Sequence, residues 1–210
     1  MGLAVYDLDK TLVRRATFTP FLIFAARRLA SWRLLFLPLW FFLILGHLAG
    51  LYDRTVLKTA AMRLMLGKVT QQQLVEIGEN FAAAHLATSG WNEDVVALMR
   101  DDERRGRTIV IATAAFRIYA QPFARRLGVK HVIATEWNGT AIVGENCYGH
   151  VKRQGVLDWA KGVTIKRMVS GSFADAPLLE LAEHPVFITD SPKKRARALD
   201  RNWHVMRPAV

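Results

Sequence analysis

Short apolar runs alternate with longer stretches of helical pattern over most of the chain. The run at 3–6 ends in Asp-Leu-Asp, and the run at 108–112 follows a charged stretch and Gly106. Both are typical of buried strands. Further strands are expected at 131–134, 167–170, 185–189 and 204–206, with helical patterns between several of them. This alternation predicts an α/β fold with a parallel sheet, in which ligands bind beyond the carboxyl ends of the strands.

The residues between the first two strands interrupt this alternation. They contain no convincing strand and are too many for one crossover helix. We therefore expect a helical insertion at 17–105 and a core formed by 1–16 together with 106–210. Within the insertion, Thr70 and Gln73 have the spacing of a capping box, which predicts a helix beginning there.

One segment of the insertion has no polar face. Residues 34–52 contain no Asp, Glu, Lys or Arg, and as one α-helix they would measure ~28 Å against the ~30 Å of a bilayer core. A single crossing would separate the ends of two neighbouring parallel strands, so it conflicts with the predicted fold. Basic residues on both sides favour a monotopic hairpin with cytoplasmic flanks. A helix buried in the protein core is the alternative.

The net charge of the chain indicates what kind of binding partner to expect. The chain has 29 Lys and Arg against 18 Asp and Glu, a net charge of +11 and a pI near 10.3, which favours an anionic partner. We find no zinc motif or basic tract with interleaved aromatics, so nucleic acid is not expected. The single cysteine, Cys147, excludes an internal disulfide and fits an intracellular protein. The two early aspartates argue against a secretory signal. The oligomeric state stays open.

The strongest chemical signal is Asp7-x-Asp9-x-Thr11 after the first strand. Two carboxylates this close would collect one hard cation such as Mg²⁺, which prefers oxygen ligands. They can also divide the work of phosphoryl transfer, one as nucleophile and the other as general acid and base. A strand ending in a capping loop is the alternative interpretation.

These residues resemble phosphatases of the haloacid dehalogenase superfamily, in the branch that includes phosphoserine phosphatase. The resemblance implies a Rossmann-like parallel sheet with a helical cap inserted after the first strand. It implies Asp7 as nucleophile, Asp9 as general acid and base, and Mg²⁺ held by Asp7 and the Asp9 carbonyl. Thr113 in "IVIATAA" matches the second motif, and Lys152 in "GENCYGHVKRQG" matches the lysine of the third. Thr11, Thr113 and Lys152 are thus expected to bind phosphate.

The fourth motif departs from this family. The branch carries Gly-Asp-Ser-x-x-Asp there, whereas this chain has "SGSFAD", so Gly171 replaces the first aspartate and Asp175 keeps the second. Asp175 is therefore expected as the further metal ligand. Loss of one anionic ligand weakens a Mg²⁺ site, so a membrane-bound pseudoenzyme or regulatory module is one alternative function.

Within the superfamily the chain most resembles the phosphatidylglycerophosphatase C type, because an arginine-containing segment leads into an apolar run. This implies a phospholipid phosphate substrate, phosphatidylglycerol biosynthesis and a monotopic or peripheral location on the cytoplasmic face of the inner membrane. Arg14, Arg15 and Arg28 are the expected headgroup ligands. A phosphatase for a soluble metabolite such as phosphoserine is the second alternative.

Overall fold

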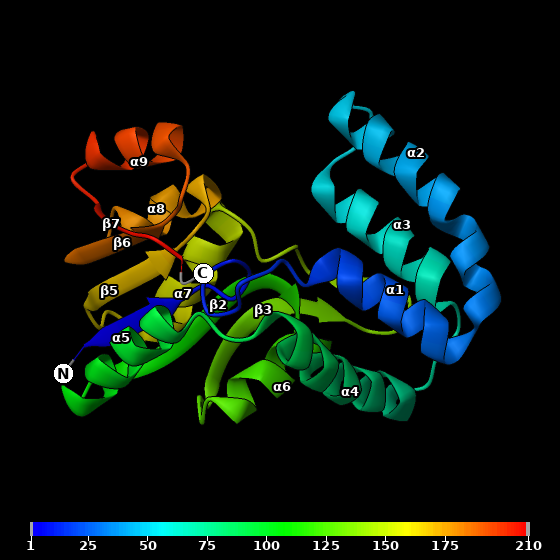
Figure 1. The fold of residues 1–210 in the computed structure, drawn as a ribbon, viewed down its shortest axis with the longest axis horizontal. Coiled ribbons are helices and arrows are strands. Elements are labelled where there is room, and N and C mark those ends of the chain that lie inside the picture. Colours follow the sequence, from blue (N-terminus) through cyan, green and yellow to red (C-terminus); the bar gives the residue numbers. More distant parts are fainter. Residues whose placement is uncertain (1, 209–210) are drawn as a thin grey trace.

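The computed structural model describes residues 2–208, and its centre is one seven-stranded sheet in the order β4-β3-β2-β1-β5-β6-β7 (Figure 1). All neighbouring pairs are parallel except β3 and β4. The strands are β1 (Leu3–Tyr6), β2 (Thr108–Phe116), β3 (His131–Trp137), β4 (Ile142–Val143), β5 (Ile165–Ser170), β6 (His184–Ile188) and β7 (His204–Met206). The predicted α/β fold is confirmed, and only the short antiparallel β4 was not expected.

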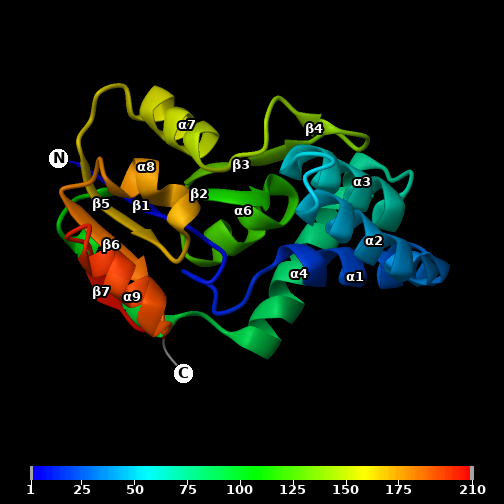
Figure 2. The same cartoon turned by 90° about the horizontal axis from the view of Figure 1, so that it is seen from above.

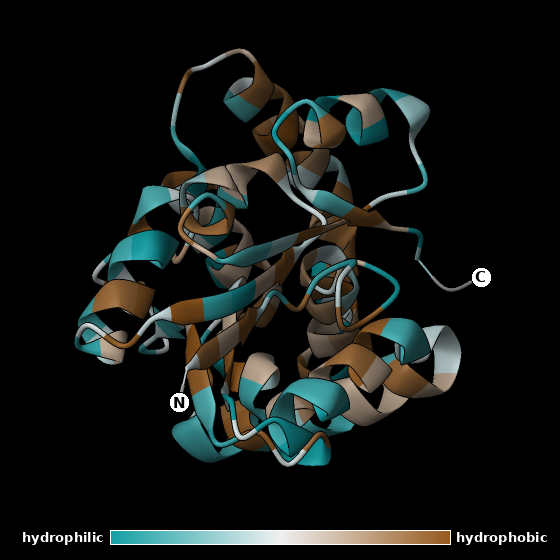
Figure 3. Cartoon of the chain, turned by 90° about the vertical axis from the view of Figure 1, so that its left-hand side faces the viewer, coloured by the Kyte–Doolittle hydropathy of each residue, from teal (hydrophilic) through white to brown (hydrophobic). Residues whose placement is uncertain are grey.

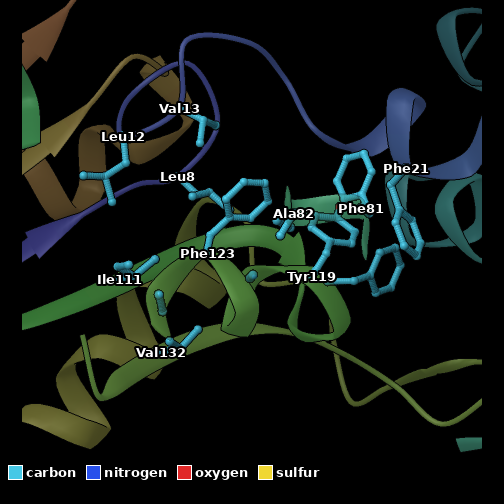
Figure 4. Close-up of a cluster of buried hydrophobic side chains, with 14 of the residues drawn as sticks. Leu8, Leu12, Val13, Phe21, Phe81, Ala82, Ile111, Tyr119, Phe123 and Val132 are labelled. Atoms are coloured by element: carbon cyan, nitrogen blue, oxygen red, sulfur yellow. The ribbon is translucent and has the colours of Figure 1, made fainter. Parts of the chain in front are cut away.

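Alternate residues of β1 enter two separate hydrophobic clusters, as the period-two pattern of a strand requires. Ala4 and Tyr6 face one cluster, and Leu3 and Val5 face the other. The first cluster continues from the sheet into the insertion (Figure 4). In Figure 3 the strands are brown for much of their length between outer helices that carry teal segments. The sheet is therefore buried on both faces.

Helices cover both faces. They are α5 (Glu93–Arg104), α6 (Arg117–Arg126), α7 (His150–Ala160), α8 (Ala176–Leu179) and α9 (Pro192–Leu199), with a 3₁₀ turn η2 (Phe173–Asp175) before α8. Helices α7, α8 and α9 each place buried residues in the second cluster, and Figure 2 shows α7 and α8 on the same side of the sheet.

The remaining helices form a second lobe beyond the carboxyl end of β1 (Figure 1). This cap consists of α1 (Phe18–Leu29), η1 (Ser31–Phe36), α2 (Leu37–Leu48), α3 (Arg54–Leu66) and α4 (Gln71–Ser89). Helix α4 begins with the expected capping box of Thr70 and Gln73. Helix α5 packs against β1 and β2. It therefore belongs to the core layer, although the sequence predicts it within the insertion at 17–105, because amphipathicity alone does not say which surface a helix covers.

The apolar segment is a 3₁₀ turn followed by a helix, not one continuous α-helix. Within residues 2–208, Ser31–Leu48 alone is long and apolar enough to cross a membrane, by length and composition only, and 6% of it is buried, the rest being exposed or half-buried. Trp40 is the one buried residue of α2. The alternative of a helix buried in the core is therefore wrong, because α2 packs against α3 and η1 by one face and leaves the other uncovered.

Candidate active site

The first two aspartates lie where β1 ends. Asp7 is buried and its amide donates to the Val169 carbonyl of β5 at 2.9 Å. The Asp9 carboxylate points toward the cap, where its Oδ1 accepts from the Thr17 amide at 2.8 Å and from the Thr17 hydroxyl at 2.7 Å. Between this pair and the rest of the loop, Lys10 has a φ of 56°, a left-handed conformation that turns the chain sharply. The Asp9 carboxylate is thus tied to the residue that precedes α1.

Lys152 joins Asp7 to Asp175 although the three residues are far apart in the sequence. Its Nζ lies 2.9 Å from Asp7 Oδ1 and 2.8 Å from Asp175 Oδ2. All three side chains are buried. Asp175 also accepts from the Ser170 hydroxyl at 2.6 Å. We call these three residues the charged triad, and in it two carboxylates share one ammonium.

Burial and charge act in opposite directions in the charged triad. Burial raises the pKa of Asp7 above the usual carboxyl range, and the Lys152 ammonium opposes this rise. For Lys152, burial favours the neutral amine, but Asp7 and Asp175 outweigh it and raise the pKa of the ammonium. Lys152 therefore stays protonated at physiological pH and presents fixed positive charge to a bound phosphate.

A cavity of about 290 Å³ opens beside the charged triad. Thr113 lines it from the carboxyl end of β2, as expected, and its hydroxyl oxygen accepts from the Ala115 amide at 3.1 Å. Thr11 does not line this cavity. Its side chain is fully buried, and its Oγ1 accepts from the Gly171 amide at 3.0 Å. The expected phosphate contact of Thr11 is therefore corrected to a structural link between the loops after β1 and β5.

Lys152 is the expected cationic residue at the cavity, and three further cationic residues there were not predicted. Lys10, Arg54 and Lys194 line it. Arg54 and Lys194 were missed because α3 and α9 meet the loop after β1 only in three dimensions, whereas Lys10 lies within that loop, between Asp9 and Thr11. Two features of the sequence could have indicated them: Arg54 is a basic residue just after the apolar segment 34–52, and Lys194 lies in the basic run "SPKKRAR". Arg54 also lies over the Tyr148 ring, with 4.5 Å between its guanidinium carbon and the ring centroid.

The three arginines expected at the headgroup lie outside this cavity. Arg14 donates to the Trp91 carbonyl at 2.9 Å, and Arg28 lies over the Phe24 ring. Arg15 is exposed and is not among the cavity's lining residues. A headgroup seated at the catalytic cavity would therefore meet Arg54 and Lys194 instead.

Comparison with known proteins identifies the family. The haloacid dehalogenase-like hydrolase family matches residues 4–192. The chain belongs to this family. The hydrolase is 34% identical over 139 residues to Protein CicA of Caulobacter vibrioides (strain NA1000 / CB15N), which covers 63% of this chain and 58% of that protein. The match thus spans less than two thirds of the length of CicA.

Solved structures confirm the fold. A protein of unknown function from Bordetella pertussis Tohama I has a TM-score of 0.79 at 24% identity and covers 97% of both chains. A phospho-aspartyl intermediate analogue of phosphoserine phosphatase has a TM-score of 0.60 at 15% identity, over 97% of this chain and 91% of that chain. At these identities the likeness shows the fold, and the family match shows that the chain is a haloacid dehalogenase-like hydrolase.

The structure explains why glycine occupies position 171. A Cβ there would lie 3.0 Å from the Lys10 carbonyl oxygen and 3.3 Å from the Ile188 carbonyl oxygen. Both contacts are with backbone atoms, which cannot rotate away as a side chain can. A side chain at position 171 would therefore require these backbone atoms to shift by a few tenths of an ångström.

Phosphatases of the haloacid dehalogenase family generally use Mg²⁺. The oxygens of Asp7 and Asp9 fit an ion that is held by few protein ligands. Thr11 Oγ1 lies 3.4 Å from both Asp7 Oδ2 and the Asp9 carbonyl oxygen, so these two hard oxygens face the same hydroxyl. Lys152 lies within 2.8 Å of both Asp175 carboxylate oxygens, so Asp175 supports the lysine and is not a free ligand. Residues 2–208 contain no group of three His, Cys, Asp or Glu arranged to hold a metal. Mg²⁺ is commonly held by one or two carboxylates with water and substrate phosphate.

Proposed function

We propose that the hydrolase dephosphorylates a membrane lipid phosphate, converting phosphatidylglycerophosphate to phosphatidylglycerol at the cytoplasmic face of the inner membrane. The observation that carries this proposal is the uncovered apolar face of η1 and α2 on the same lobe that supplies Arg54 to the catalytic cavity. A soluble enzyme gains nothing from exposing such a face, which favours association with other molecules.

The reaction follows from the charged triad and its neighbours. Asp7 attacks the phosphorus and displaces the lipid alkoxide, which takes a proton from Asp9. Asp9 then removes a proton from water, and the resulting hydroxide attacks the phosphorus of the aspartyl-phosphate, which releases inorganic phosphate and regenerates Asp7. Lys152 and Thr113 hold the phosphoryl oxygens through both steps. Bound Mg²⁺ at Asp7 and the Asp9 carbonyl would neutralise further phosphate charge.

The proposed membrane contact is the apolar face of η1 and α2, which we call the docking face. Leu35 is 78% exposed, Phe42 65% and Leu48 74%. Its large exposed hydrophobic residues are Trp32, Leu35, Leu39, Phe41, Phe42, Leu45 and Leu48, and Leu51 just after α2 extends it. One packed face and one exposed face suit a helix lying at the membrane surface better than one inserted across it.

Cations flank the docking face. Arg33, Arg63 and Lys68 line a cavity of about 650 Å³ with no acidic residue among its lining residues. Arg33 also lies over the ring of the exposed Trp32, with 4.9 Å to its centroid. Aromatic and cationic side chains together favour the headgroup region of an anionic membrane. This arrangement supports a lipid surface over another protein as the partner.

The likeness to phosphoserine phosphatase structures favours the second candidate, a phosphatase for a soluble phosphomonoester. The two are separated by measuring phosphate release with Mg²⁺ present from phosphatidylglycerophosphate, phosphatidate and phosphoserine, all in the same detergent. We expect the lipid phosphates to be hydrolysed and the Asp7→Asn variant to release none. Preference for phosphoserine would refute the lipid assignment, and no release by the native protein would favour the pseudoenzyme.

Membrane association has a separate test. The native protein should sediment with vesicles that contain phosphatidylglycerol, and Leu35→Glu combined with Phe42→Glu should remain in the supernatant. Leu181→Glu is the matched control, because Leu181 is a 42% exposed hydrophobic residue outside the cap. Equal sedimentation of all three proteins would rule out the docking face as the contact.

A further inference from the structure

A buried lysine of the cap is not used by the reaction described above. Lys58 of α3 is 4% exposed. Its Nζ donates to the Ala114 carbonyl at 2.5 Å and to Asn146 Oδ1 at 2.9 Å. The same Nζ lies 4.6 Å from the centroid of the Phe116 ring and 5.3 Å from that of Phe18. No carboxylate of residues 2–208 forms an ion pair with it. Buried charges are normally paired, so this position is costly for the fold.

The contacts of Lys58 join three segments of the core. Ala114 directly follows Thr113, whose hydroxyl lines the catalytic cavity. Thr135 of β3 donates to the same Ala114 carbonyl at 2.9 Å, and its hydroxyl lies 3.1 Å from Asn146 Oδ1. The Cys147 amide donates back to the Thr135 hydroxyl oxygen at 3.1 Å. Asn146 and Cys147 lie in the loop that leads into α7, the helix that carries Lys152.

We propose that Lys58 is a positioning residue for phosphoryl transfer: its ammonium ties the cap helix α3 to the end of β2 and to the loop before α7, and so sets the positions of Thr113 and Lys152. The inference rests on the phosphatase reaction and is independent of whether the substrate is a lipid. A charged donor is suited to this task, because its hydrogen bonds are about twice as strong as those of a neutral donor.

The surroundings of Lys58 make its charge sensitive to pH. Burial lowers the pKa of Lys58, Arg54 of the same helix and Lys152 of α7 act in the same direction, and Asp9 and Cys147 oppose them; together they bring the pKa to about 7. The ammonium is therefore lost as the pH rises through neutrality. A phosphate dianion in the neighbouring cavity favours the protonated form and shifts this loss to higher pH.

The test compares Lys58→Met and Lys58→Arg with the native enzyme, using p-nitrophenyl phosphate and Mg²⁺ between pH 5.5 and 9. Lys58→Met should lower kcat by roughly 10- to 100-fold, the size expected when a charged hydrogen bond is removed. In the native enzyme, kcat/KM should fall above about pH 7, and kcat should fall only at higher pH. Lys58→Arg keeps its charge throughout, so it should retain more activity than Lys58→Met and lose this alkaline decline. Lys130→Met, at an exposed lysine, is the control and should match the native enzyme.

Two measurements separate positioning from a structural role. The melting temperature of Lys58→Met should equal or exceed that of the native protein, because an unpaired buried charge has been removed. Backbone hydrogen exchange at 113–116 and 145–148 should increase in Lys58→Met and stay unchanged in β6. The proposal is overturned if Lys58→Met retains native kcat, if Lys58→Arg keeps the alkaline decline, or if exchange at both segments is unchanged. The exchange result stands even if no phosphomonoester is hydrolysed, an outcome that would count against the proposed function alone.

Discussion

Replacing Lys152 with methionine removes the positive member of the charged triad and keeps most of the side-chain volume. Asp7 and Asp175 would then face each other with no ammonium between them, although both are buried. Breaking a buried ion pair by removal of one partner costs about 3–5 kcal/mol. Because a domain is stable by only about 5–15 kcal/mol, the variant should be strongly destabilised and catalytically inactive.

The loss of stability in Lys152→Met should become larger as the pH rises. Without Lys152, nothing opposes the burial and the Asp175 charge that raise the pKa of Asp7 in the folded state above its unfolded value. Groups with a raised pKa favour folding when protonated, so the variant should be least stable relative to the native protein above pH 7 and should recover toward pH 4 to 5. Adding Asp175→Asn removes one of the facing charges and should restore part of the stability without restoring activity.

Urea unfolding followed by tryptophan fluorescence at pH 5 and pH 7.5 measures both effects. Lys166→Met is the matched control, because Lys166 pairs with Glu183 at 2.7 Å on the surface, and such exposed pairs contribute about 0–1 kcal/mol. A Lys152→Met protein within about 1 kcal/mol of the native free energy of unfolding at pH 7.5 would refute the reasoning. Equal losses in the two lysine variants would do the same.

Other substitutions test the site independently. Asp7→Asn should abolish phosphate release while the protein stays folded by circular dichroism, and Asp9→Asn should lower kcat by about 10²- to 10⁴-fold, as expected for loss of a general acid and base; wild-type turnover in either would contradict the assigned roles. Gly171→Asp restores the family residue. It should lower the free energy of unfolding by about 1–3 kcal/mol, because the new side chain crowds the Lys10 carbonyl. Gly171→Ala adds the same Cβ without a carboxylate and should lose a similar amount in thermal unfolding, so native stability in both would show that the loop can open.

The sequence alone determined the features that depend on short-range pattern. Apolar runs with turn residues on either side predicted six of the seven strands, and the spacing of Thr70 and Gln73 predicted the start of α4. Asp7 was predicted from its place after the first strand, Thr113 and Lys152 were predicted from the family motifs that they resemble, and the structure places all three at one cavity. Local periodicity and motif spacing are properties of neighbouring residues, so no knowledge of tertiary contacts was needed.

Tertiary structure alone decided which distant residues meet. Arg54, Lys194 and Lys58 reach the site from α3 and α9, and the relative placement of these helices depends on packing between segments far apart in the chain. The same is true of Gly171, which lies close to the backbone carbonyls of Lys10 in the loop after β1 and Ile188 at the end of β6. The apolar segment shows most clearly what the sequence cannot predict. Its composition predicted an unusual helix, but only its packing against α3 determined which face stays exposed. Side-chain chemistry can be predicted from sequence, whereas the side of a helix that remains uncovered is set by the surface it packs against.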